Sequence, residues 1–155
     1  ETKQFKKYNF ATERSKYLSN LGIPLNTDST LKGQTVFLAE RCAELMNNDI
    51  ITDRTVIDVM AFTMNAKSIG HYDKEIFESY AKEFIREYDY IFYISPYGIP
   101  MEDNGVRETD EHYRDLIDFT ITTLIKRYSH MANKIEKISG STDERVEQIL
   151  KFTNL

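Results

Sequence analysis

The sequence predicts an α/β fold with three layers (αβα), in which a mostly parallel sheet lies between two layers of helices. Two short apolar runs, residues 50–52 and 90–94, are bounded by polar residues and lack the alternation of a half-exposed strand, which is typical of buried parallel strands. Segments with helical spacing lie between these runs, as βαβ units require. The 155 residues contain no linker, repeat or low-complexity tract, so we expect a single domain.

The first half of the chain gives two strands and two helices. Residues 7–12 are rich in aromatic and β-branched side chains, which favours a strand. A helix is expected over 13–21, ended by the glycine and proline in 22–24. Apolar residues at helical spacing predict a helix over 31–46, followed by the strand 50–52.

The second half continues the alternation. Pro96 closes the second apolar strand, and Thr109 or Asp110 is the expected cap of a long helix. The expected elements here, in chain order, are a helix over 55–66, a helix over 73–87, a strand over 89–95, a helix over 109–131, a short strand over 135–139 and a helix over 142–152. We expect the strand that ends at Asp53 to be central, with helices on both faces.

Composition narrows the classes of function. The net charge of −5 gives no electrostatic reason to expect direct binding to nucleic acid or to an anionic membrane. The single cysteine, Cys42, cannot form an internal disulfide, which favours a reducing, cytoplasmic setting. No apolar run is long enough to span a bilayer, and no signal peptide is visible. His71, His112 and His130 have no metal-ligand spacing.

Acidic and basic residues follow the expected strands in pairs. Asp53 and Arg54 come directly after the central strand, where ligands sit in open α/β sheets, and could hold a metal ion and a phosphate. Glu13 and Arg14 follow the first strand and could accept a hydroxyl proton and bind phosphate. The alternative for both pairs is a structural role. The carboxylate would then cap the start of a helix or interact favourably with its dipole, and the arginine would lie in solvent.

Two further segments are candidates. Residues 101–114 turn on an Asn-Gly pair and present Arg107 and Arg114, which suits a lid that closes over a transferring phosphate; the alternative is a solvated loop that caps a helix. Gly140 and Ser141 could pack against a purine, or form a routine strand-to-helix turn with an N-cap. We expect Asp53, the pair at 13–14 and the lid arginines to converge on one cleft.

Together these pieces resemble the small P-loop ATPase and kinase group. The similarity is to the bacterial nicotinamide-riboside kinase domain and the AAA-type ATPase domains grouped with it, many of them phage-encoded. It covers nearly the whole chain, and the segment from Glu102 to Arg107 is its most specific part. The pieces that carry it are Thr12-Glu13-Arg14, Gln34, Thr52 to Asp58 with the helix to Phe62, Tyr90-Ile91-Phe92-Tyr93, Glu102 to Arg107 with Tyr113-Arg114, and Gly140-Ser141 with Glu144-Arg145.

The resemblance implies a P-loop kinase-like domain that uses ATP or GTP with Mg²⁺ and transfers the γ-phosphoryl group to a small acceptor. The acceptor would be a nucleoside or nucleotide, such as nicotinamide riboside or a deoxynucleotide. Asp53 would take the acidic Walker B position, touching Mg²⁺ or the acceptor hydroxyl, and Arg107 with Arg114 would stabilise the transferring phosphate. Glu13, Arg14 and Arg54 would face the acceptor, and Gly140 with Ser141 the nucleotide.

One part of the family pattern is missing. No Gly-x-x-x-x-Gly-Lys-Ser/Thr sequence occurs in the 155 residues. The chain begins with Glu1 rather than Met, and we expect the first strand and phosphate loop of the family to lie upstream of it. The alternative function is a nucleotide-binding regulatory module that hydrolyses its nucleotide slowly or not at all.

Overall fold

A computed structural model describes residues 5–12, 15–97 and 110–154 of the chain. It is a mixed α/β structure in which strands alternate with helices. The strands are β1 (Asn9–Ala11), β2 (Ile50–Thr52), β3 (Ile91–Ile94) and β4 (Ile135–Ile138). The helices are α1 (Ser15–Asn20), α2 (Leu31–Leu45), α3 (Val56–Asn65), α4 (His71–Ala81), α5 (Glu111–Tyr128) and α6 (Thr142–Thr153), with short 3₁₀ helices η2 (Asn26–Asp28) and η3 (Lys82–Glu87).

The four strands form two separate parallel pairs. β1 pairs with β2 in the register Asn9 to Ile50, and β3 pairs with β4 in the register Ile91 to Ile135. The prediction of parallel pairing is therefore confirmed within each pair. The expectation of one sheet with β2 at its centre is not met, because no strand lies between β2 and β3 in the described part of the chain.

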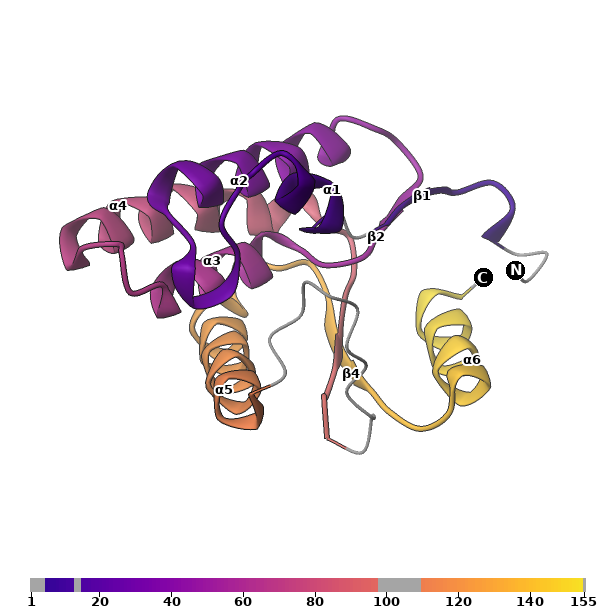
Figure 1. Cartoon of the computed structure of the whole chain (residues 1–155). Helices are drawn as coiled ribbons and strands as arrows, with labels where there is room; N and C mark the ends of the chain where they lie inside the picture. Colours follow the sequence, from indigo (N-terminus) through magenta and orange to yellow (C-terminus); the bar gives the residue numbers. More distant parts are fainter. Residues whose placement is uncertain (1–4, 13–14, 98–109, 155) are drawn as a thin grey trace.

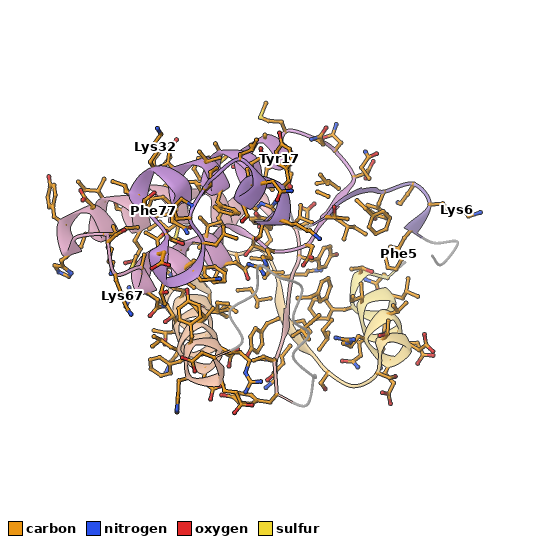
Figure 2. The ribbon with its side chains drawn as sticks, viewed as in Figure 1. Phe5, Lys6, Tyr17, Lys32, Lys67 and Phe77 are labelled. Carbon is orange, nitrogen blue, oxygen red and sulfur yellow. The ribbon has the colours of Figure 1, made fainter. Side chains whose placement is uncertain are left out.

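The hydrophobic core lies mainly among the helices. α3 is its central element and packs against α2, α4 and α5. Most of its apolar residues are buried, because they lie on nearly all sides of the helix. Figure 2 shows Phe77 of α4 pointing into this bundle, whereas Lys32 and Lys67 point outward. α5 and α6 lie on opposite sides of the β3–β4 pair (Figure 1).

The expected helix over 73–87 is divided into α4 and η3. From Lys82 the chain tightens to 3₁₀ geometry, which changes the angular spacing of the side chains. That change keeps Ile85 and Tyr88 buried beside Ala81. The apolar pattern alone does not reveal the change, because positions three residues apart share a face in either helix.

The turn from β2 into α3 is held by a capping box. The Thr55 amide and hydroxyl both donate to the Asp58 carboxylate, at 2.7 and 3.1 Å, and the Thr55 hydroxyl accepts from the Ile57 amide. Such boxes satisfy amides that a helix start leaves without intrahelical partners. The box therefore fixes where β2 ends and α3 begins.

Candidate functional site

The candidate site is built around the turn that carries Asp53 and Arg54. The Asp53 amide donates to the carbonyl of Ala11 at 2.9 Å, which ties the turn to β1. The Asp53 side chain is exposed at the carboxyl end of β2. Arg54 has a φ of +81°, and its guanidinium lies 5.3 Å from the centre of the Phe62 ring. A positive φ is unfavourable for a residue with a Cβ, so the fold holds Arg54 in a strained backbone conformation.

A buried ion pair holds the backbone of this turn in place. The guanidinium of Arg41, a residue only 4% exposed, donates to the Asp53 carbonyl at 2.9 Å and to the Glu44 carboxylate at 2.7 Å. Both charged groups come from α2, so this helix fixes the end of β2. A guanidinium with two strong acceptors in a site shielded from water holds its position firmly.

Tyr88 holds the start of α3, which follows this turn. Its hydroxyl accepts a hydrogen bond from the amide of Val56, the first residue of α3, at 3.2 Å. Burial is the main cause that raises the pKa of Tyr88 well above its ordinary value, and the neighbouring carboxylates of Asp58 and Glu44 add to the rise. The Tyr88 phenol therefore stays neutral and acts as a fixed acceptor.

One large cleft connects this turn with α5. It has a volume of about 1480 Å³, and Asp53, Arg54, Arg114 and Asp118 are among its lining residues. Arg114 lies in the first turn of α5, contacts Asp115 at 3.2 Å and stands 5.7 Å from the centre of the Tyr97 ring. The structure thus places three of the sequence-predicted site residues on a single cleft.

A tyrosine–carboxylate pair in the same cleft was not found from the sequence. The Tyr93 hydroxyl donates to the Asp118 carboxylate at 2.6 Å, and both residues line the cleft. Burial, followed by this hydrogen bond, raises the pKa of Tyr93 to about 12. The available signal was the position of Asp118 four residues after Arg114, which puts both side chains on one face of α5.

Gly140 and Ser141 lie outside the cleft lining. The Ser141 hydroxyl caps α6 by accepting from the Glu144 amide at 3.3 Å, and the Ser141 amide donates to the Glu144 carboxylate at 2.7 Å. Gly140 has a φ of +98°, and a Cβ there would approach the Glu144 carboxylate to 2.5 Å. The capping alternative describes this turn, and contact with a purine stays a prediction.

The other predicted site residues are not placed. Glu13, Arg14 and Arg107 fall outside the described residues, so their convergence with Asp53 stays a prediction. Within the described ranges, no group of three or more His, Cys, Asp or Glu side chains is arranged to hold a metal ion. No helix in those ranges is long and apolar enough to cross a membrane. No family model, curated protein or solved structure matches the chain.

Proposed function

We propose that this chain is part of a phosphotransferase of the P-loop NTPase kind, with a three-layer αβα fold, that acts on a small nucleoside or nucleotide. The observation that carries the proposal is that Asp53, Arg54 and Arg114 line one cleft. An exposed carboxylate and two guanidiniums around one space provide the charges that phosphoryl transfer needs, because catalysis there is mostly positioning and electrostatic stabilisation.

The parallel strands support the proposal. Asp53 and Arg54 follow β2 at its carboxyl end, the edge at which open α/β sheets bind ligands. The Arg41–Glu44 pair and the Thr55–Asp58 box hold this edge rigidly. A site on a preorganised turn loses little energy to rearrangement when charge develops on the phosphoryl group.

Asp53 is the proposed ligand of Mg²⁺ or acceptor of the substrate's hydroxyl proton. A single carboxylate fits Mg²⁺, which commonly keeps water and substrate phosphate as its other ligands. When bound, the ion would neutralise charge on the phosphate oxygens. The Asp53 main chain is already engaged with Ala11 and Arg41, so the exposed carboxylate points from a fixed backbone.

The arginines divide between the acceptor and the transferring phosphate. Arg54, held beside Phe62, is proposed to face the acceptor together with Glu13 and Arg14. Arg114 is proposed to meet the phosphoryl oxygens together with Arg107, since bidentate guanidiniums match phosphate geometry. The triphosphate of ATP or GTP has no phosphate-binding loop in this chain, so no residue here is assigned to it.

A phosphotransfer assay of the intact protein tests the proposal. ATP and GTP serve as donors with Mg²⁺, and the acceptor panel contains nucleosides, nucleotides and nicotinamide riboside. Asp53→Asn is nearly isosteric and is expected to remove most of the activity while leaving the circular dichroism spectrum unchanged. Asp28→Asn is the matched control, because Asp28 is also exposed but lies outside the cleft. Arg107→Ala is expected to lower turnover far more than nucleotide affinity.

Two results would count against the proposal. Equal turnover of Asp53→Asn and the wild type would remove the carboxylate from the mechanism. Nucleotide binding by the wild type without transfer to any acceptor would favour the regulatory module instead.

A further inference from the structure

The inner edges of the two strand pairs have no strand partner in the described structure. The Asn9 amide donates to the Asp49 carbonyl at 2.7 Å, and the Asp53 amide donates to Ala11, so alternate residues of β2 face β1. Main-chain groups of a strand alternate in direction, which leaves Ile50 and Thr52 facing away from β1. No strand pairs with this edge among the residues that the structure describes.

β3 has the same arrangement on its side. The Ile91 amide donates to the Lys134 carbonyl at 2.8 Å, which directs Ile91 toward β4. The main-chain groups of Phe92 and Ile94 therefore face away from β4, and in the described ranges no strand pairs with them either. An edge of this kind is a template for another strand.

Both edges open on the same cleft. Residues of β2 and of β3 line the space of about 1480 Å³ that also contains the candidate site. The cleft has apolar side chains on two sides, with Ile117 and Ile121 from α5 and Val146 and Ile149 from α6. A strand buried between two such sides would be apolar on both faces, as central strands of parallel sheets are.

The apolar face of α6, which borders this cleft, is incompletely packed. Phe152 of this helix contacts the rings of Tyr90 and Phe92, yet none of the residues in its apolar stripe is buried. The helix stands apart from the other helices (Figure 1). A surface helix normally buries its apolar stripe against another element, and one strand in the cleft would supply that element.

Acidic residues at one end of the cleft indicate which charge a strand bound in the cleft should carry at that end. Asp49 precedes β2, and Glu87 and Asp89 precede β3; all three side chains are exposed, and all three residues line the cleft. The amino ends of both strands are therefore acidic. A parallel occupant would place its own amino end there, so basic residues at that end would be electrostatically complementary.

We propose that this cleft binds one extended peptide segment as a β-strand parallel to β2 and β3, which joins the two pairs into a single five-stranded sheet. The segment is apolar and β-branched along its length and basic at its amino end. Hydrogen bonds to Ile50 and Thr52 on one side and to Phe92 and Ile94 on the other provide the recognition. This inference does not depend on phosphotransfer.

Residue-resolved amide hydrogen exchange of the full chain with a synthetic peptide tests the inference. The probe is an acetylated and amidated peptide with the sequence Lys-Lys-Val-Ile-Val-Ile-Val-Ser. Exchange at the amides of Ile50, Thr52, Phe92 and Ile94 is expected to slow by about tenfold or more at saturating peptide. The matched control peptide is N-methylated at alternate residues, which removes donors from one of its edges while keeping its side chains, and it is expected to lose the protection on at least one strand.

Two variants of α6 provide a second measurement. Ile149→Gln places a polar group in the cleft and is expected to weaken binding of the peptide by about tenfold. Lys151→Gln changes an exposed residue of the same helix that does not line the cleft and is expected to leave binding unchanged. Equal affinities in the two variants would contradict the assignment of the cleft.

Three outcomes of the exchange experiment would overturn the inference. Unprotected amides at saturating peptide would show that the edges do not accept a strand. Equal protection by the N-methylated peptide would show apolar binding without strand pairing. Protection that rises with protein concentration in the absence of peptide would show that a second copy of the chain covers the cleft.

Discussion

Replacing Arg41 by Met should strongly destabilise the protein. Arg41 is 4% exposed, and its guanidinium joins the Glu44 carboxylate to the Asp53 carbonyl. Methionine fills similar volume without charge, so the substitution removes the ion pair while creating little cavity. The Glu44 side chain, which is also buried, then loses the guanidinium that contacts it at 2.7 Å.

The expected magnitude follows from burial. Removing one partner of a buried ion pair typically costs about 3–5 kcal/mol, because the remaining charge is poorly solvated. In a chain of this size, each kcal/mol lowers the melting temperature by about 2–4 °C. A fall in the melting temperature of about 10 °C is therefore expected.

Two further variants separate burial from charge. Arg86→Met breaks the Arg86–Glu83 pair, which has the same three-residue spacing and a 2.6 Å contact but half-exposed side chains, and should change stability by less than about 1 kcal/mol. The double substitution Arg41→Met with Glu44→Leu removes both buried charges and should recover most of the loss. Thermal and urea unfolding, followed by circular dichroism, measure all four proteins.

Either of two results would refute this prediction. Equal losses of stability in Arg41→Met and Arg86→Met would show that burial does not decide the value of the pair. A double variant as unstable as Arg41→Met alone would show that the hydrogen bond from the guanidinium to Asp53, rather than the buried Glu44 carboxylate, sets the cost.

Two other predictions concern the strained turn and the tyrosine in the cleft. Arg54→Gly should be more stable than Arg54→Ala by about 1 kcal/mol in urea unfolding, because both lose the contact with Phe62 but only glycine tolerates the positive φ; equal stabilities would contradict the strain. The raised pKa of Tyr93, about 12, means that the folded state holds the phenolic proton more tightly than the unfolded chain does. Its contribution to stability is therefore complete below about pH 10 and lost as the pH rises through about 12. Alkaline unfolding of the wild type should show this loss, and Tyr93→Phe should show a smaller one, because the raised pKa of Tyr88 still contributes.

The parts of the fold that sequence predicted well are those set by neighbouring residues. Ile50–Thr52 and Ile91–Ile94 are strands because short apolar runs between polar boundaries favour buried extended chain. Ser141 caps α6, as the N-cap alternative for this turn expected. Asp110 likewise caps α5, as one of the two expected residues.

The parts that sequence could not predict depend on long-range contacts. The separation into two strand pairs depends on which strands hydrogen-bond to each other, and no local sequence pattern contains that information. Arg41 lies in a helix where a charged residue is expected at the surface, and an arginine three residues before a glutamate is as typical of exposed pairs as of buried ones. The Tyr93–Asp118 bond joins residues that are 25 positions apart.

The most direct test of the proposed site is the rate of phosphoryl transfer in a single turnover by the intact protein and its Arg114→Gln variant. Arg114 lines the cleft beside Tyr97, and an arginine that stabilises the transferring phosphate is worth on the order of a thousandfold in rate. We expect a loss of about that size with nearly unchanged nucleotide affinity, and an unchanged rate for Arg86→Gln, a variant of a half-exposed arginine outside the cleft. Equal rates for Arg114→Gln and the wild type would show that Arg114 does not stabilise the transferring phosphate.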